Sequence, residues 1–493
     1  MKIIGGLDIG TTGCKISLYD ENSAILETYY AEYDAVRQSG GHEIDFGAVK
    51  EKVMCLFKKA VEKYEITVLG VTSFGETFVM LDGDDNILAP SILYTDPRGA
   101  EECLSLCEGL GEDKLTLLTG AKPNCMYSIY KMMWHKNNTP HLFEKCKKML
   151  LCEDFIIYCL TGVRQISYSL AARTGAFDIE KKCWIKKIFD TAGINVNLMS
   201  APVREGNVCG KITDKVKNEL GIAYDIAIVS AGHDQIANMV GSGIFEKTQA
   251  MDGTGTVECM PVILQNKPTD IGFYQGGYAV VPYLDDKYAC YAFSFTGGAT
   301  LKWFRDNFAE AEHKKAVSEG KNVYAQLDER VGDKPTEILI LPHFAGAATP
   351  YMDNDAKAAF VGITLETDKF DLYKALMEGT SYEMRLNFNI IKKYVGEIEE
   401  IRTTGGGASS DVWLQIKADI LQNEIVALNC KEVGAAGSAA MAGHAVGVYK
   451  NIKEATAKMA PVRKVFHPNE RNSLIYTECY KKYENLYKAI KNL

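Results

Sequence analysis

The stretch Ser230-Ala-Gly-His-Asp-Gln-Ile-Ala-Asn238 places a single carboxylate, that of Asp234, where a helix is expected to begin. The apolar run at residues 226–229 predicts a buried strand, residues 231–233 a turn, and residues 235–239 the opening of a helix. A helix N-terminus holds a carboxylate in its ionised form, which can accept a proton from a substrate hydroxyl group at neutral pH. The alternative is an aspartate that only caps the helix. Asp234 is therefore a candidate general base.

A turn of glycines and threonines near the start of the chain is a candidate phosphate site. Residues 2–9 and 14–19 are predicted strands, and Gly10-Thr-Thr-Gly13 joins them as a tight turn. N–H and hydroxyl groups in such a turn can bind phosphate oxygens, and Asp8, near the end of the first strand, can hold Mg²⁺ through water. A turn without any ligand is the plainer interpretation.

A second segment of the same kind, Asp252-Gly-Thr-Gly-Thr256, also lies between apolar strands. We interpret it as a diverged copy of the first hairpin, and two copies imply two related domains that face one nucleotide. The expected domains are residues 1–245 and 246–493. This division agrees with the length of 493 residues, which is too great for a single core.

Other polar segments follow apolar runs. Glu76, Asp96 and Arg98 stand at such ends, where sheet proteins place ligand-binding side chains, although each also fits a solvated loop. The run Gly405-Gly-Gly407 lies between a predicted strand and a helix expected at 412–421. Glycines there allow the backbone to approach a phosphate group or an adenine closely.

The composition excludes several classes of function. With 47% hydrophobic and 24% charged residues, the chain has the proportions of an ordinary soluble protein. A net charge of −9 and the lack of a long basic run argue against nucleic acid or an anionic membrane surface as partner. No apolar run has membrane-spanning length and no secretory leader is recognisable, so we expect a cytoplasmic protein.

The 14 cysteines are scattered without CxxC spacing, which favours reduced thiols over a zinc site. The Walker pattern GxxxxGK[ST] does not occur, so a P-loop fold is excluded.

In this order along the chain, the motifs resemble those of the FGGY carbohydrate kinases. The segments that carry the resemblance are Asp8-Ile-Gly-Thr-Thr-Gly13, Leu93-Tyr-Thr-Asp-Pro-Arg98, Gly232-His-Asp-Gln235, Asp252-Gly-Thr-Gly-Thr256, Gly297-Gly-Ala299, Leu341-Pro-His-Phe-Ala-Gly346, Thr349-Pro350, Gly362-Ile-Thr364 and Gly405-Gly-Gly-Ala408. The resemblance implies an α/β fold of two actin-like, ribonuclease H-like ATPase domains. It also implies that ATP binds in the cleft between them and that the cleft closes over a sugar or polyol.

The same resemblance implies roles for single residues. Asp234 is similar to the family's catalytic base, and Asp8 to its Mg²⁺-associated carboxylate. Positions similar to ATP-binding ones are Thr11, Thr12, Gly253, Thr254, Gly255, Gly298, Lys302, Gly406, Gly407 and Asp411. Lys302 and Asp411 replace amide side chains of glycerol kinases. Positions assigned to the substrate are Glu76, Asp96, Arg98 and Gln235.

The predicted substrate pocket combines features of two branches of the family. Residues 70–77 are similar to glycerol kinases, including Glu76, but Gly75 stands where those enzymes have an arginine. The segment Asp96-Pro-Arg98 is closer to xylulokinases. Xylulokinases usually carry a Met-His pair at the position of Gly75-Glu76, however, and this chain lacks that pair. We predict ATP- and Mg²⁺-dependent phosphorylation of a hydroxyl group on a small ketose, with xylulose or a related pentulose as the first candidate.

Two alternatives stay open at this point. One is a kinase for glycerol, a tetritol or another polyol, and the other is an actin-like ATP-binding sensor that has no phosphoryl acceptor. The sequence does not fix the sugar, the hydroxyl group that is phosphorylated, an allosteric effector or the oligomeric state, for which a homodimer is one option.

Overall fold

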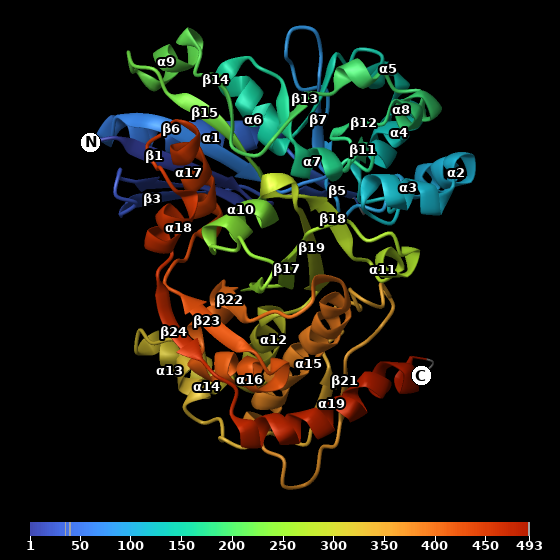
Figure 1. Ribbon diagram of the computed structural model, residues 1–493, viewed down its shortest axis with the longest axis vertical. Coiled ribbons are helices and arrows are strands. Elements are labelled where there is room, and N and C mark those ends of the chain that lie inside the picture. The colour runs from blue at the N-terminus through green and yellow to red at the C-terminus, as the bar shows by residue number, and fades with distance from the viewer. Residues whose placement is uncertain (35, 39–40, 492–493) are drawn as a thin grey trace.

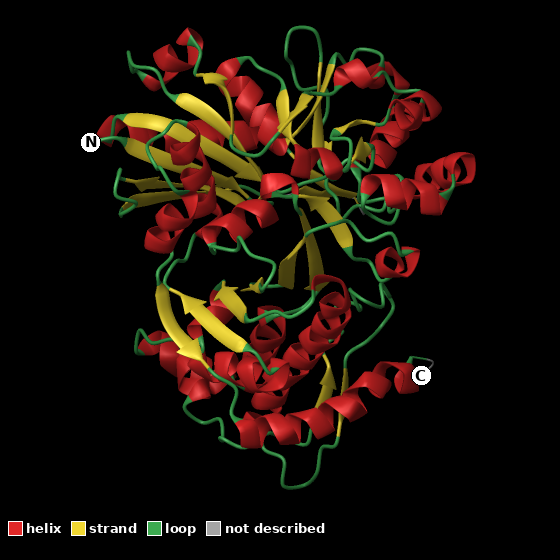
Figure 2. Cartoon of the chain, viewed as in Figure 1, coloured by secondary structure: helices red, strands yellow, loops and turns green. Residues whose placement is uncertain are grey.

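The computed structural model describes residues 1–34, 36–38 and 41–491. Two large α/β units lie one above the other, each organised on its own mixed β-sheet (Figure 1). Helices cover both sheets, and most of the loops lie at the surface (Figure 2). In the described part of the chain, the first sheet has six strands in the order β14 (Asn207–Lys211), β15 (Ala227–His233), β6 (Ile66–Ser73), β1 (Ile3–Ile9), β2 (Gly13–Tyr19) and β3 (Ile25–Glu32).

The alternation of side chains along β1 divides the first unit into two layers of core. Ile3, Leu7 and Ile9 share one cluster of buried residues with helices α1 (Phe46–Lys63) and α6 (Cys152–Thr161). Ile4 belongs to a different cluster, formed with helices α17 (Val433–Ala445) and α18 (Ile452–Met459). Because neighbouring residues of a strand point to opposite faces, the first sheet is covered on both sides.

Helix α17 lies unusually close to the first sheet. A Cβ atom on Gly6 would be 1.9 Å from the carbonyl oxygen of Ala435, and one on Gly70 would be 2.3 Å from that of Ser438. Only glycines in the strands allow this approach, and the small residues at 434–443 complete it from the helix side. This segment of the second half thus packs on the first sheet (Figure 1). A domain boundary near residue 245 remains our proposal, and α17 is a crossing element.

The second sheet repeats the pattern of the first. Its order among the described residues is β18 (Ala279–Pro282), β19 (Tyr288–Ser294), β17 (Glu258–Leu264), β16 (Gln249–Thr254), β22 (Glu400–Thr404), β23 (Glu424–Leu428) and β24 (Val462–Phe466). Strand β16 pairs antiparallel with β17 and parallel with β22, as β1 does with β2 and β6. This equivalence places the two Gly–Thr turns at corresponding positions of the two units. The α/β class and the two actin-like units are therefore confirmed.

The helices that cover the second sheet and the strands beside them are α12 (Gly298–Phe308), α13 (Glu310–Ser318), α14 (Val323–Asp328), β20 (Leu339–Leu341), β21 (Ala359–Val361), α15 (Lys369–Val395), α16 (Asp411–Leu421) and α19 (Glu470–Ile490). Insertions in the first unit contribute β4 (Val36–Gln38), β5 (Gly41–Ile44), β7 (Phe78–Leu81), β8 (Ser91–Ile92), α2 (Ala100–Leu110), α3 (Glu112–Thr119), α4 (Ser128–Asn138), α5 (Pro140–Phe143), β9 (Lys148–Leu151), β10 (Gln165–Ser167), α7 (Tyr168–Ala172), β11 (Phe177–Asp178), β12 (Cys183–Trp184), α8 (Lys186–Ala192), β13 (Ala201–Val203) and α9 (Asp214–Leu220). Helix α10 (Asp234–Gly241) connects the first sheet to the second unit, where α11 (Ile271–Gln275) lies. Within residues 1–34, 36–38 and 41–491, no helix is both long enough and apolar enough to cross a membrane.

Candidate active site

Strand β15 delivers Asp234 to the first position of helix α10, as the sequence predicts. One detail differs, because residues 231–233 continue the strand instead of forming a turn. The pairing of β15 with β6 shifts register between Ser230 and Gly232, and Gly232 has a φ of 92°. Such a bulge bends the strand end, which directs Asp234 away from the sheet.

Buried polar groups hold this bend in place. The carboxylate of Glu153, on α6, accepts the N–H of Gly232 at 2.7 Å and the hydroxyl of Ser230 at 2.8 Å. The hydroxyl of Ser169 accepts the N–H of His233 at 3.0 Å. Every one of these partners is buried, so the backbone just before Asp234 is held in place by hydrogen bonds that are shielded from water. Sequence analysis missed Glu153 and Ser169, since neither belongs to a recognisable motif.

The environment of Asp234 raises its pKa to about 7. Burial is the largest cause, and the nearby carboxylates of Asp8 and Glu76 add to it, whereas the Gln235 N–H and the Arg173 guanidinium oppose it. The expectation of a carboxylate kept ionised by the helix N-terminus is thus corrected, because burial and like charges outweigh the helix. The side chain is 26% exposed and lies 3.3 Å from Nε2 of His233, whose own pKa is lowered by burial and by Arg173.

Glu76 stands beside this base in a strained backbone conformation. Its φ is 64°, and the N–H of Thr77 donates to the carbonyl of Gly75 at 2.7 Å across it. A positive φ is rare for a residue with a side chain and concentrates at functional sites. Oε1 of Glu76 accepts a 2.6 Å hydrogen bond from Nε of Arg173, a buried residue that sequence analysis did not single out. The sequence does offer one signal for Arg173, because this arginine lies between Ala172 and Gly175 in a segment of otherwise small residues.

Asp96 and Arg98, predicted to bind substrate, mainly bind each other. Nε and Nη2 of Arg98 each donate at 2.8 Å to the two carboxylate oxygens of Asp96. Oδ2 of Asp96 also accepts the N–H of His42 at 2.7 Å. Burial alone would raise the pKa of Asp96, but these hydrogen bonds outweigh burial and lower the pKa to about 2. Arg98 is also paired with Glu43 at 2.8 Å, so both side chains act first as structural groups of this loop.

Asp8 occupies the end of β1 and is the candidate Mg²⁺ carboxylate. Burial raises its pKa to about 6, Lys15 opposes that effect, and Glu432 adds to it. Gly434 at the start of α17 allows space for it, since a Cβ there would be 2.8 Å from Oδ2 of Asp8. Among the described residues no cluster of three or more acidic, histidine or cysteine side chains could hold a metal alone. One carboxylate is enough for Mg²⁺, which usually takes one or two carboxylates together with substrate phosphates.

The first Gly–Thr turn is open to a ligand. The N–H of Gly10 donates to the carbonyl of Gly13 at 2.9 Å, and the hydroxyl of Tyr33 donates to the same carbonyl at 3.1 Å. The N–H groups of Thr11 and Thr12 find no acceptor within the described residues, and Thr12 is exposed. Two N–H donors that no described residue uses, at the end of a closed turn, fit the predicted phosphate site.

The second turn is tied to the protein itself. Lys417 of α16 is buried and donates to the Thr254 hydroxyl at 2.6 Å and to Glu258 at 2.7 Å, and it also pairs with Asp252. The N–H of Gly255 donates to Val257, and that of Gly298 donates to the carbonyl of Gly255 at 2.8 Å. The predicted ATP contacts of Gly253, Thr254, Gly255 and Gly298 remain predictions. The last three already have protein partners.

The remaining predicted nucleotide positions are Gly406, Gly407, Lys302 and Asp411. A Cβ on Gly407 would be 2.7 Å from Thr254, so the glycine run at 405–407 packs directly on the turn. Lys302 is exposed on α12. Asp411 is paired with Arg463 at 2.8 Å and with Lys464 at 2.7 Å, and these bonds compete with any contact to a ligand. Helix α16 follows the run as expected, and its apolar stripe, Trp413, Ile416 and Ile420, is buried.

The two units converge at Cys259 on β17. Burial raises the pKa of this thiol, and both Asp234 and Asp252 raise it further. The base of the first unit and the turn of the second are therefore both close to this residue. The geometry combines a base with a pKa near neutrality, a carboxylate suited to Mg²⁺ and a turn that can bind phosphate in one interdomain site.

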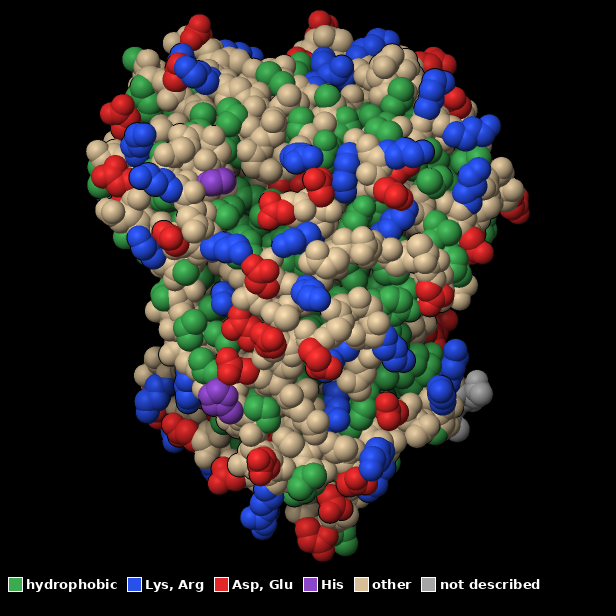
Figure 3. All heavy atoms as spheres, in the orientation of Figure 1, with side chains coloured by type: hydrophobic (Ala, Val, Ile, Leu, Met, Phe, Trp, Pro, Cys, Tyr) green, Lys and Arg blue, Asp and Glu red, His purple; other side chains and the backbone are tan. Residues whose placement is uncertain are grey.

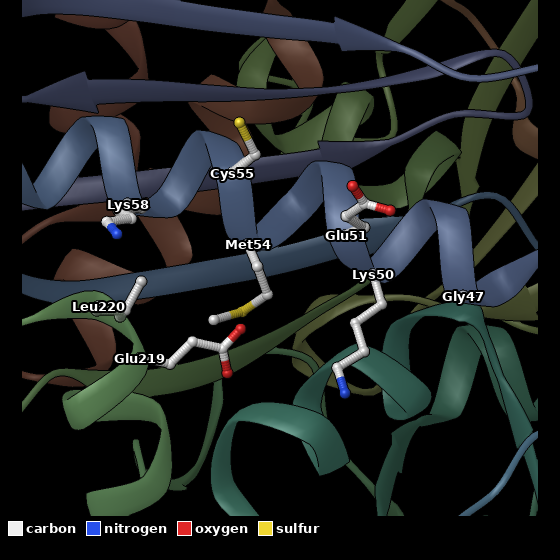
Figure 4. Close-up of a pocket in the computed structure, with 8 residues that line it drawn as sticks. All are labelled: Gly47, Lys50, Glu51, Met54, Cys55, Lys58, Glu219 and Leu220. Carbon is white, nitrogen blue, oxygen red and sulfur yellow. The ribbon is translucent and has the colours of Figure 1, made fainter.

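A second concave surface lies apart from this site. A groove of about 490 Å³ lies between α1 and α9, lined by Gly47, Lys50, Glu51, Met54, Cys55, Lys58, Glu219 and Leu220 (Figure 4). Its charges are of both signs, and none of its residues belongs to the site described above. On the face seen in Figure 3, basic and acidic side chains are intermixed, without a continuous basic stripe.

Comparison with known proteins agrees with this geometry. Residues 3–241 match the model of the FGGY family of carbohydrate kinases, N-terminal domain, and residues 253–446 match the model of the C-terminal domain. The chain belongs to the FGGY family of carbohydrate kinases. It is thus a sugar kinase, and kinases of this family use ATP with Mg²⁺.

Relatives of this FGGY kinase include enzymes for different substrates. A xylulose kinase of Staphylococcus epidermidis is 27% identical over 100% of this chain and 98% of its own. A glycerol kinase of Thermococcus gammatolerans is 29% identical over 95% of this chain and 94% of its own. A ligand-bound xylulose kinase from Lactobacillus acidophilus superposes with a TM-score of 0.90 at 22% identity, covering 100% of this chain and 99% of that one. The family membership argues against the non-catalytic sensor.

Proposed function

We propose that this FGGY kinase transfers the γ-phosphoryl group of ATP to a hydroxyl group of a small ketose, with xylulose or a related pentulose as the first candidate. The observation that carries the proposal is Asp234, held at the start of α10 with a pKa of about 7 beside Glu76 and Arg173. A base works best when its pKa is near the working pH, because it is then both deprotonated and a good proton acceptor. The xylulose kinase relative that aligns over the whole chain supports a pentulose.

In the proposed reaction, the carboxylate of Asp234 accepts the proton of the attacking hydroxyl group. No described residue binds Oε2 of Glu76, so this oxygen can accept a second substrate hydroxyl group and orient the sugar. The N–H groups of Thr11 and Thr12 bind phosphate oxygens, and Asp8 holds Mg²⁺, which supplies positive charge for those oxygens when bound. Phosphoryl transfer needs little more than such positioning and charge stabilisation.

A polyol is the second candidate. Glu76 and the glycerol kinase relative favour a polyol substrate. Gly75 argues against glycerol, because glycerol kinases have an arginine at this position. The cytoplasmic location and the homodimer remain predictions from the sequence.

The test is ADP release from Mg·ATP over a panel of D-xylulose, L-xylulose, D-ribulose, L-ribulose, D-fructose, glycerol, erythritol and L-erythrulose. We expect turnover with one ketose, and we expect Asp234→Asn to lower kcat about 10²- to 10⁴-fold, the usual contribution of a general base. ATP affinity, measured by calorimetry, should change little. Preference for glycerol or erythritol would favour the second candidate, and an active Asp234→Asn enzyme would refute the assignment of the base.

A further inference from the structure

Arg173 follows helix α7, and its guanidinium group is enclosed by aromatic rings from both units. Its Cζ atom lies 5.1 Å from the ring centre of Tyr127 and 5.8 Å from that of Tyr291. Tyr291 belongs to β19 of the second sheet, whereas Arg173 and Tyr127 belong to insertions of the first unit. The guanidinium group therefore lies where the two units meet, next to the base.

Two polar groups of this cluster have unused hydrogen-bonding capacity. Nε and Nη2 of Arg173 both point to Oε1 of Glu76, but Nη1 is buried and has no acceptor in the described part of the chain. The hydroxyl of Tyr291 is likewise buried without a partner among the described residues. Buried polar groups in native proteins are nearly always paired, so such orphans indicate that a ligand or a water molecule belongs there.

We propose that Nη1 of Arg173 and the hydroxyl of Tyr291 form a subsite for the carbonyl oxygen of a neutral ketose, a proposal that rests on the kinase function proposed above. A guanidinium group only donates hydrogen bonds, so its partner must be an oxygen with free lone pairs. A carbonyl oxygen offers two lone pairs and no hydrogen atom of its own, and it can accept from both groups. A polyol hydroxyl in the same place would have to donate its own hydrogen atom, for example to the Tyr291 oxygen, so it would use this oxygen as an acceptor and could not present the same two lone pairs as freely as a carbonyl oxygen does.

The local charges select a neutral sugar over a sugar acid. Glu76 already compensates the single positive charge of Arg173, and Asp8 and Glu76 both act on Asp234 as repelling charges. A substrate carboxylate would add one more anion to this group. Arg173 therefore recognises an oxygen dipole and not a net negative charge.

Gly75 makes room for this arrangement. A Cβ there would lie 3.1 Å from Cγ of Arg173 and 3.1 Å from Cδ2 of His233. The chain thus lacks an arginine at position 75 but has a guanidinium group, from residue 173, packed against that position and bonded to Glu76. The sugar pocket is built around Arg173.

The experiment compares matched substrates that differ only at the carbonyl carbon: D-xylulose with xylitol, D-ribulose with ribitol, and L-erythrulose with erythritol, plus D-xylonate as the acid. Steady-state kcat and KM are measured for the wild type, Arg173→Met, whose apolar side chain still fills the space between the tyrosines, and Tyr291→Phe, which removes one hydroxyl group. We expect the wild type to prefer a ketose over its polyol at least 10²-fold in kcat/KM, since sites built to hydrogen-bond a group reject analogues that lack it.

In Arg173→Met this preference should fall at least about tenfold, through KM for the ketose, and in Tyr291→Phe it should fall several-fold without a change in Tm. Equal losses for ketose and polyol in both variants would show a structural role and overturn the subsite, as would a wild type that prefers a polyol or xylonate. A wild type inactive on every ketose and polyol would overturn the proposed function, and the subsite with it. Tyr291→Phe decides the question if Arg173→Met does not fold.

Discussion

The two Gly–Thr turns occupy equivalent positions in the two sheets, but their aspartates have opposite surroundings. Asp8 is half-buried with a raised pKa, and its neighbour across the β1–β2 pair, Lys15, is paired with Glu432 instead. Asp252 is paired directly with the buried amine of Lys417, which also binds Thr254 and Glu258. The duplicated motif has therefore diverged into one turn that can take a cation and one that contains its own.

This difference assigns separate tasks to the two turns. Burial opposes a charge on Lys417, but Asp252 and Glu258 outweigh it and raise the pKa of the amine, so the cluster stays charged inside the second unit. A lysine there does for Asp252 what Mg²⁺ can do for Asp8, without a dependence on nucleotide. We infer that the first turn binds the metal and the phosphate groups. The second turn, in contrast, serves as a rigid support on which the glycine run at 405–407 packs.

The strongest test of this comparison removes the internal cation. Lys417→Met leaves Asp252 and Glu258 buried without a positive partner, and breaking a buried ion pair in this way typically costs about 3–5 kcal/mol. We expect a loss of that order in the free energy of unfolding, measured by urea denaturation. Lys464→Met is the matched control, since the Lys464 side chain is 51% exposed and its amine pairs with Asp411. Its loss should stay below about 1 kcal/mol. Similar losses in both variants would mean that the Lys417 cluster is not a structural centre.

The second test makes the same substitution in both turns. Asp8→Asn removes the carboxylate available to Mg²⁺, and we expect kcat/KM to fall on the order of 10²-fold or more, with a steeper requirement for added Mg²⁺. Asp252→Asn leaves Lys417 paired with Glu258, so its kcat should fall less than about tenfold while its stability decreases. The division of tasks would be refuted if Asp252→Asn lost activity as strongly as Asp8→Asn and Mg²⁺ dependence changed equally in both.

The sequence predicts what is local and misses what is brought together by folding. Asp8, Asp234 and the two turns lie in short motifs, so residue type and spacing were sufficient to single them out as candidates. The missed groups act over long separations: Arg173 binds Glu76 from 97 residues away, Glu153 binds Gly232 from 79, and Lys417 binds Asp252 from 165.

The same reason explains two features that the sequence left incomplete. Helix α17 has the composition of a closely packed helix, but nothing in it reveals that its partner is the first sheet. Asp96 and Arg98 stand at a position typical of ligand-binding residues, yet their two-residue spacing lets them bond each other. The sequence singles out Asp234 as a candidate base but does not reveal its raised pKa, because burial and the two nearby carboxylates are properties of the folded site.

The smallest expected effect concerns stability against pH in the enzyme without metal and nucleotide. The pKa of Asp8 is raised to about 6, so the folded state holds this proton more tightly than the unfolded state does. The resulting stabilisation is complete below the unfolded pKa near 4 and is lost as pH rises through 6. Asp8→Asn cannot ionise, and we expect it to exceed the wild type in unfolding free energy by about 1–2 kcal/mol at pH 8, with the difference shrinking toward pH 4.

Asp252→Asn is the second variant in this measurement. The comparison of the two turns predicts that its change in unfolding free energy at pH 8 has the opposite sign to that of Asp8→Asn. Removing Asp252 takes one partner from a buried lysine, so this variant should be less stable than the wild type at pH 8. Urea denaturation at pH 5, 6, 7 and 8 in the presence of a chelator gives both differences directly. If both substitutions stabilised the protein at pH 8, Asp252 would be as poorly compensated as Asp8, and Lys417 would not serve as the internal cation of the second turn.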